Sequence, residues 1–153
     1  MNQRFQEIVR ECQQRTSELM GMPSRPWGEF SSLPKSGMYV FYEGETPVYV
    51  GRSNRLKGRL AEHARPSSTH YSAPFAFNLA KEAAANRGMP TEGKGRSDLE
   101  RVPESSRLFG AAKERVRKMR YRAVAVENQL VQTLLEVYIH LELGTKHNDF
   151  STH

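Results

Sequence analysis

Apolar side chains recur along this chain with two different periods. Residues 3 to 20 place apolar side chains near one face of a helix with charged ones opposite, and residues 128 to 142 show the same period more clearly. Gly144 is expected to end the second helix. The predicted apolar positions are Phe5, Ile8, Val9, Cys12, Leu19 and Met20 in the first helix, and Leu130, Val131, Leu134, Tyr138 and Leu141 in the second.

The other period is that of strands. Residues 37 to 42 and 46 to 51 are aromatic and β-branched, with Glu43-Gly44-Glu45 between them, which predicts an antiparallel hairpin. Residues 121 to 126 alternate in the same way and predict a third strand.

The segments between these elements are less regular. Residues 22 to 35 are rich in Pro, Gly and Ser and predict a connector, while residues 87 to 106 carry Gly, Pro and charges and predict a long loop. Three further helices are predicted, from a cap at Ser53 or Asn54 to about Ala64, from 73 to 86 and from 107 to 118. We expect one domain over residues 1–153, with an N-terminal helix and connector at 1–35 and an insert at 65–118.

Composition narrows the class of protein. The chain has 153 residues, the size of one domain, and a mean hydropathy of -0.69. It has no apolar stretch of about 18 residues, so we expect no membrane span. The polar residues 1 to 10 lead us to expect a cytoplasmic protein. The single cysteine, Cys12, cannot form an internal disulfide or a zinc cluster with other cysteines.

The charge indicates a polyanionic partner. The net charge is +6, and basic residues concentrate in the runs 52 to 65 and 107 to 122. Solvated helix faces would give the same runs, but these two flank the candidate site described next, which favours phosphate contact. The expected phosphate contacts are Arg52, Arg55, Lys113, Arg117 and Arg120.

Candidate chemistry begins in the hairpin and the helix after it. Tyr39 and Tyr49 are phenols whose ordinary pKa, about 10, would need a nearby metal or arginine to fall. Arg59 and His63 are spaced i, i+4 and would share one helix face, where Arg suits a phosphate and His suits proton transfer near neutral pH. Packing tyrosines and a solvated basic helix remain the alternatives.

One acidic residue stands out in the last predicted helix. Glu136 lies away from the predicted apolar stripe, as a metal ligand facing a cleft or an ordinary exposed glutamate would. Glu127 and Glu142 compete for the same role.

The candidate residues stand in a fixed order and spacing around two triplets. Gly37-Met38-Tyr39 and Tyr49-Val50-Gly51 are followed by Arg59 and His63, and Leu134-Leu135-Glu136 stands twelve positions before Asn148. This order and spacing resemble the GIY-YIG nuclease superfamily, and the spacings after the second triplet are most similar to its type II restriction branch. The resemblance covers residues 37 to 63 and about 119 to 148. The chain departs from the family pattern in Met38 and Val50, which replace isoleucines, and in lacking a proline shortly before Asn148.

The resemblance implies a fold and a reaction. The fold is α+β, a small three-stranded antiparallel sheet flanked by helices. The reaction is hydrolysis of a DNA phosphodiester with one Mg²⁺ or Mn²⁺ per active site, held by Glu136. Tyr39 would deprotonate the attacking water and pass the proton toward His63, Tyr49 would position water or phosphate, and Arg59 would stabilise the transition state. Asn148 would orient a phosphate oxygen or a neighbouring side chain.

Three functions stay open. The first is a sequence-selective DNA endonuclease of restriction type, with a homodimer as one arrangement. The second is a structure-selective, single-strand or nicking nuclease of repair or mobile-element conflict. The third is a non-cleaving nucleic-acid-binding protein on the same scaffold. All three have DNA as partner, and we expect neither membrane association nor a small-molecule cofactor.

Overall fold

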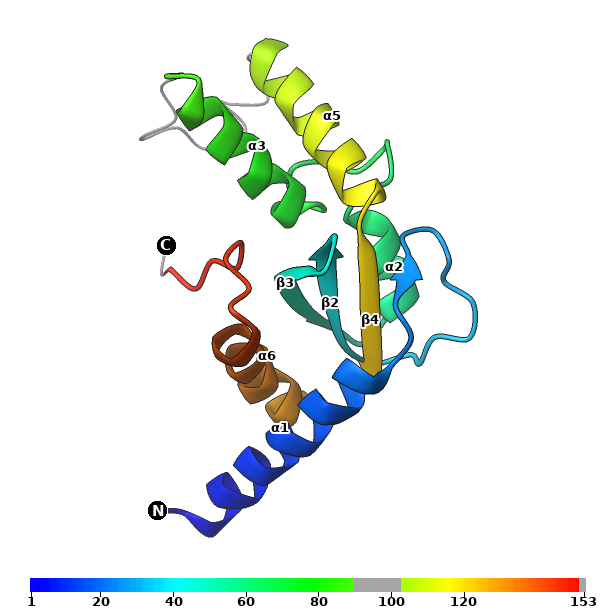
Figure 1. Cartoon of the computed structure of the whole chain (residues 1–153), viewed down its shortest axis with the longest axis vertical. Coiled ribbons are helices and arrows are strands. Elements are labelled where there is room, and N and C mark those ends of the chain that lie inside the picture. Colours follow the sequence, from blue (N-terminus) through cyan, green and yellow to red (C-terminus); the bar gives the residue numbers. More distant parts are fainter. Residues whose placement is uncertain (90–102, 152–153) are drawn as a thin grey trace. The chain divides into compact units, whose positions relative to one another are not determined.

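The computed structural model describes residues 1–89 and 103–151 of the chain (Figure 1). In this part of the chain, the fold is α+β, with five helices and a four-stranded antiparallel open sheet in the order β1-β4-β2-β3. The strands are β1 (Arg25–Pro26), β2 (Gly37–Glu43), β3 (Thr46–Ser53) and β4 (Arg120–Ala125). The helices are α1 (Gln3–Gly21), α2 (Leu56–Glu62), α3 (Pro74–Asn86), α5 (Pro103–Arg117) and α6 (Gln129–Leu143).

The chain forms two compact units. The first contains Met1–Arg59 and Met119–His153, and therefore holds the whole sheet with α1 and α6. The second, Leu60–Lys118, contains α3 and α5, which pack against each other, and it includes the insert predicted at 65–118. Helix α2 begins in the first unit and ends in the second.

The sheet has one strand more than predicted. The hairpin of β2 and β3 and the later strand β4 are confirmed, but β1 lies inside the segment predicted as a connector and pairs with β4, Arg25 opposite Tyr121. A strand of two residues is too short to show alternation, and Pro26 argues against a strand except at an edge, which is where β1 lies. The three-stranded sheet expected from the sequence is therefore corrected to four strands.

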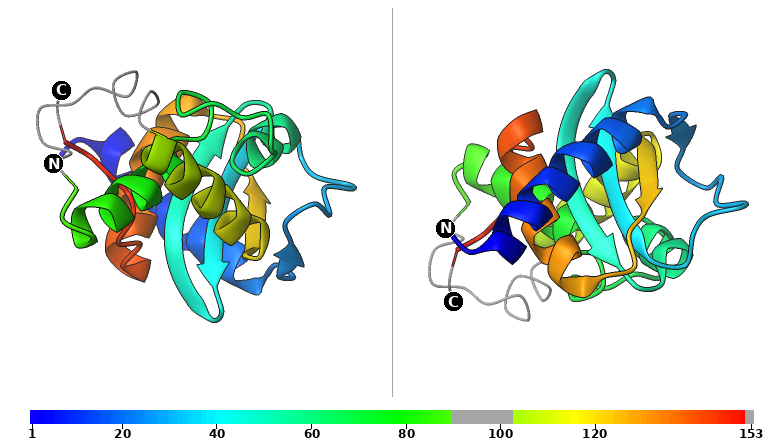
Figure 2. Two further views of the ribbon diagram at one scale, coloured as in Figure 1. Left: turned by 90° about the horizontal axis from the view of Figure 1, so that it is seen from above. Right: turned by 90° about the horizontal axis from the view of Figure 1, so that it is seen from below.

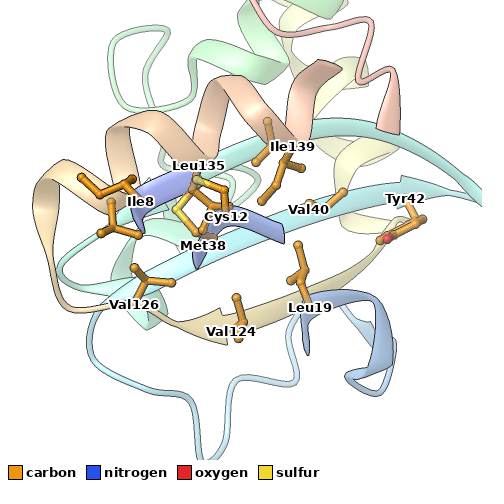
Figure 3. Packing of buried hydrophobic residues seen from close by; sticks show 12 residues of the cluster. Ile8, Cys12, Leu19, Met38, Val40, Tyr42, Val124, Val126, Leu135 and Ile139 are labelled. Atoms are coloured by element: carbon orange, nitrogen blue, oxygen red, sulfur yellow. The ribbon is translucent and has the colours of Figure 1, made fainter. Parts of the chain in front are cut away.

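The main core lies on one face of the sheet. Helices α1 and α6 both cover that face (Figure 2, right), and side chains at alternate positions of β2 point toward them. Figure 3 shows this cluster at close range. Its buried members are Ile8, Cys12, Leu19, Met38, Val40, Tyr42, Val50, Val124, Val126, Val131, Leu135 and Ile139.

The buried face of α6 matches the predicted one only in part: of the predicted apolar positions, Val131 is buried, and Leu134 and Tyr138 pack partly buried against the core cluster. Val131, Leu135 and Ile139 are buried, whereas Leu130 and Leu141 are 55% and 75% exposed. The helix is apolar on two neighbouring stripes, so periodicity alone did not select between them, and packing against α1 and the sheet did. Helix α1 is confirmed, but its terminal apolar residues, Phe5 and Met20, are exposed.

Helix ends are corrected in two places. Helix α2 stops at Glu62 and does not reach Ala64. Helix α5 begins at Pro103 and not at residue 107, which suits a proline in the first turn followed by Glu104 near the positive end of the helix dipole. Most of the loop predicted at 87–106 lies outside the described residues. Helix α6 ends as predicted at Gly144, which adopts a left-handed φ of 70°.

Two expectations from composition concern the single cysteine and membrane-spanning helices. Cys12 is a buried free thiol in the core between α1 and the sheet. Within residues 1–89 and 103–151, every helix is too short or too polar to cross a bilayer.

Candidate active site

A pocket of about 280 Å³ opens in the first unit, where the ends of several elements converge. Four of the six residues predicted as catalytic line it, and they come from β2, β3, α2 and α6. The predicted phosphate contact Arg52 lines it as well. The complete lining is Tyr39, Tyr49, Gly51, Arg52, Ser53, Asn54, Arg59, Gln132 and Glu136.

Strand register brings the two tyrosines to one face. Tyr39 pairs with Gly51, and Gly51 stands two positions after Tyr49, so both phenols project from the face opposite the main core. The ring of Tyr39 crosses Gly51, because a Cβ built there would lie 2.8 Å from its Cε2 and closer still to its hydroxyl. The glycine of the second triplet is therefore needed to make room for the tyrosine of the first.

Glycine is needed at position 37, in the first triplet, for a different reason. A Cβ at this position would meet the backbone of the neighbouring strand β4, lying 3.0 Å from the carbonyl carbon of Val124 and closer to its oxygen. The glycine thus allows β2 and β4 to pair closely at the end of the sheet.

The environment of the pocket moves the pKa values of both phenols further above neutral pH. Burial raises the pKa of Tyr39 well above 10, and its side chain is only 1% exposed. Burial likewise raises the pKa of Tyr49 to about 12, although this side chain is half-buried. The guanidinium of Arg59 hydrogen-bonds to both hydroxyls and opposes the rise in pKa, while the carboxylate of Glu136 adds to it.

Arg59 owes its position to the start of α2. The backbone N–H of Arg55 donates to Ser53 Oγ at 2.9 Å, and the N–H of Leu56 donates to the carbonyl of Lys35 at 2.9 Å. Leu56 is fully buried and anchors the first turn. Arg59 lies one turn after Arg55, which is exposed at the head of the helix.

Glu136 reaches the pocket from α6, on the edge of the buried stripe. Its Oε2 accepts a hydrogen bond from Arg52 Nε at 2.9 Å, and the two side chains are 25% and 41% exposed. This ion pair joins β3 to α6 across the wall of the pocket.

Gln132 is a residue of the pocket that the sequence analysis missed. It lies one turn before Glu136, is 1% exposed, and donates from Nε2 to the carbonyl of Val126 at 2.7 Å and to Asn54 Oδ1 at 3.1 Å. It thereby ties α6 to the turn between β3 and α2, and so fixes Glu136 relative to Arg59. The i, i+4 spacing from Glu136 was the available signal.

Asn148 does not line the pocket. Its Oδ1 accepts from the N–H of Val50 at 2.9 Å and its Nδ2 donates to the carbonyl of Val50 at 2.8 Å. The side chain extends the sheet at the outer edge of β3, where His147 N–H also donates to the carbonyl of Val48 at 3.1 Å. Asn148 therefore holds the strand between Tyr49 and Gly51 through the backbone of Val50. The predicted role of orienting a phosphate oxygen or a neighbouring side chain stays a prediction.

His63 belongs to the second unit. It is fully buried, with its ring centroid 6.3 Å from that of Phe75 in an edge-to-face arrangement. The predicted helix does not extend to His63, because α2 ends at Glu62 and His63 lies in the turn that follows.

Three predicted phosphate contacts have backbone partners. Lys113 is buried and its Nζ donates to the carbonyls of Pro66 and Ser68 at 2.7 and 2.9 Å. Burial, followed by the charge of Arg117, lowers the pKa of Lys113. Arg117 donates to the carbonyl of Ala64 at 2.6 Å, and Arg120 donates to the hydroxyl and the carbonyl of Ser24 at 2.9 and 2.8 Å.

The burial of Lys113 corrects its predicted role. An ammonium group held by two carbonyls inside the second unit supports the segment before α3, so its donors are already engaged within the protein. Arg52 and Arg59, by contrast, keep their guanidinium groups at the pocket.

The donor set of the pocket fits one hard dication. Glu136 supplies a carboxylate, and among the described residues no group of three or more His, Cys, Asp and Glu side chains gathers for a metal. Mg²⁺ is commonly bound by one or two carboxylates together with water and substrate phosphates, so a single glutamate beside two arginines is compatible with it. Glu136 is the residue that would hold such an ion, and in this structure its Oε2 accepts a hydrogen bond from Arg52.

Comparison with known proteins adds no relative. No protein-family model, no curated protein and no solved structure matches this chain.

Proposed function

We propose that this pocket is the active site of a divalent-metal-dependent DNA endonuclease of the GIY-YIG kind, which cuts duplex DNA at selected sequences as type II restriction enzymes do. One observation carries the proposal. Tyr39, Tyr49, Arg59 and Glu136 are scattered over about a hundred residues of sequence, and the fold brings them to one pocket. The preference for selected sequences comes from the resemblance to the restriction branch.

The charges of the pocket suit a phosphodiester. Arg52, Arg59 and Glu136 line the pocket together, so the three side chains carry a net charge of +1 at neutral pH. Arg59 presents a planar fork of N–H donors that matches two oxygens of one phosphate. Its donors would strengthen their hold as negative charge grows on the phosphate oxygens in the transition state.

The tyrosines supply hydrogen bonds and a proton acceptor. Tyr49, protonated because its pKa is about 12, orients the attacking water or a phosphate oxygen through its hydroxyl. Tyr39 accepts the proton of that water as a phenolate, after its own proton has left to solvent through the pocket, an ionisation that burial and Glu136 both oppose. A divalent metal at Glu136 would supply Lewis acidity at the leaving oxygen and positive charge that offsets the carboxylate's effect on both phenols.

The test is cleavage of supercoiled plasmid in Mg²⁺, in Mn²⁺ and in EDTA. Wild-type protein should give discrete, metal-dependent bands. Glu136→Ala should give none while binding DNA as well as or better than wild type, because it loses the metal ligand and one negative charge. Glu142→Ala is the matched control, since Glu142 is an exposed glutamate on the same helix that does not line the pocket.

The products also separate the alternatives. Nicked circles or a smear would indicate a structure-selective or nonspecific nuclease. Salt-sensitive binding without any cleavage would favour a non-cleaving DNA-binding protein. In such a protein, the ion pair of Arg52 with Glu136 and the protonated tyrosines would only shape the binding surface. Undiminished cleavage by Glu136→Ala would refute the proposed metal ligand.

A further inference from the structure

The carboxylate proposed to hold a metal already has a partner in the protein. Arg52 Nε lies 2.9 Å from Glu136 Oε2, the separation of a charge-assisted hydrogen bond. Both side chains also line the pocket into which a DNA phosphate would come. A metal ion and Arg52 therefore compete for one carboxylate, and Glu136 and a phosphate compete for one guanidinium.

The geometry leaves this pair able to separate. The Arg52 side chain is 41% exposed and Glu136 is 25% exposed, so each can reach solvent without unpacking the core. Arg52 follows Gly51 on β3, while Glu136 projects from α6, so rotating one side chain breaks the contact without moving either element. The tie between Gln132 and Asn54 holds α6 against the β3–α2 turn independently of this pair.

We infer that Arg52 exchanges partners, pairing with Glu136 in the free protein and moving to a phosphate when DNA binds, so that DNA and metal each strengthen the binding of the other. This inference rests on the proposed function. Without DNA, the guanidinium neutralises the carboxylate and repels a dication. With DNA, the phosphate takes the guanidinium and the freed carboxylate faces the metal.

The size of the coupling is set by how exposed the pair is. Breaking an exposed ion pair changes the binding constant of a competing ligand by up to about fivefold. This factor is also the lower end of the range typical for coupling between two ligands, so we expect a coupling of about fivefold. The coupling must be reciprocal, so the factor by which DNA tightens the metal equals the factor by which the metal tightens DNA. A pocket of this kind would bind its metal up to about fivefold more tightly on DNA than in the free protein.

Binding of Mn²⁺ to the DNA-free protein, followed by titration calorimetry, tests the exchange without reference to activity. Arg52→Gln should bind Mn²⁺ about fivefold more tightly than wild type, because the competing cation is gone. Lys57→Gln is the control, since it removes one positive charge from an exposed position of α2 that does not line the pocket, and its affinity should match wild type. Glu136→Gln should show no Mn²⁺ binding.

Each outcome has a distinct meaning. Equal Mn²⁺ affinity of wild type and Arg52→Gln, with binding still abolished by Glu136→Gln, would overturn the exchange and leave the metal site standing. Equal binding by wild type and Glu136→Gln would overturn the metal site and the exchange together. A thermal melt checks that each variant is folded. If Arg52→Gln is not folded, Arg52→Lys serves as a second variant. Its Mn²⁺ affinity should lie between that of wild type and the fivefold tighter affinity expected for Arg52→Gln.

A second measurement tests the other half of the exchange. DNA binding in EDTA, followed by fluorescence anisotropy of a labelled duplex at several salt concentrations, counts phosphate contacts. Arg52→Gln should reduce the slope of log affinity against log salt by about one if Arg52 moves to a phosphate. An unchanged slope would show that Arg52 stays with Glu136 as a fixed bridge and would overturn the exchange.

Discussion

Replacing Gly51 by alanine should separate folding from activity in this protein. The added Cβ would lie 2.8 Å from Cε2 of Tyr39, and the phenol oxygen would be closer still. Carbon atoms in favourable contact stand about 3.5–4.0 Å apart, so the ring of Tyr39 must move by about 1 Å. The ring packs edge-to-face against Phe41 at 5.8 Å and is almost fully buried, so that movement is resisted.

The magnitude follows from these contacts. Overpacking of a well-packed site typically costs about 1–3 kcal/mol, which a domain of this size can lose while staying folded. A catalytic group displaced by about 1 Å can lose about a hundredfold in rate. We therefore expect Gly51→Ala to lower the free energy of unfolding modestly and to lower the rate of plasmid cleavage by about two orders of magnitude.

The assay compares denaturant unfolding, followed by circular dichroism, with initial rates of cleavage in Mg²⁺. Gly21→Ala is the control, because Gly21 ends α1 in the same unit and a Cβ there meets nothing within 4 Å. Its rate should equal that of wild type. A wild-type cleavage rate for Gly51→Ala would refute the reasoning that Tyr39 must lie across Gly51 to act.

Gly37→Ala should, in contrast to Gly51→Ala, act mainly by lowering the stability of the fold. Its Cβ would collide with the backbone of Val124, which cannot rotate aside as a ring can, so β2 and β4 must separate. The loss of stability should reach or exceed the upper end of the range of about 1–3 kcal/mol, and activity should fall with the folded fraction. Gly37→Ala with full stability would contradict the close approach of the two strands.

Three further predictions concern single groups. Arg59→Lys should lose most of its cleavage rate in the plasmid assay, because a point charge cannot replace a planar fork, and near-normal turnover would count against Arg59 as the phosphate clamp. Lys113→Met should lower the unfolding free energy by about 1–3 kcal/mol by leaving two carbonyls without a donor, with little change in DNA affinity. A large loss of DNA affinity at full stability would restore Lys113 as a phosphate contact. Because the pKa of Tyr39 stands above 10, the phenolate is scarce at neutral pH, and the cleavage rate in saturating Mg²⁺ should rise about tenfold per pH unit from pH 6 to 8. A flat profile would point to another proton acceptor.

Much of the fold followed from the sequence because it depends on local pattern. Helices α1, α3 and α6 and the β2–β3 hairpin were expected within a few residues of their observed bounds, since period and turn residues act over short distances. The residues at the pocket were expected through the spacing of the two triplets with Arg59 and Glu136. The active-site assignment made from that spacing stays a prediction.

Other features depend on contacts between distant segments, which no local pattern records. The two-residue strand β1 exists only because β4 lies beside it. Helix α6 could bury either of two apolar stripes, and its packing on α1 and the sheet decided between them. The sequence did not show that Asn148 would bond to the edge of β3, where its Oδ1 accepts from the N–H of Val50 and its Nδ2 donates to the carbonyl of Val50.

The same division applies to charge. Composition alone determined that this chain is basic and that its arginines and lysines cluster in two runs. Only the tertiary structure decided that Lys113 is buried as a support, that Gln132 fixes α6 to the turn before α2, and that Arg52 lies against Glu136. The physical reason is that a side chain's role depends on its burial and its nearest partner, and both are set by residues far away in the sequence.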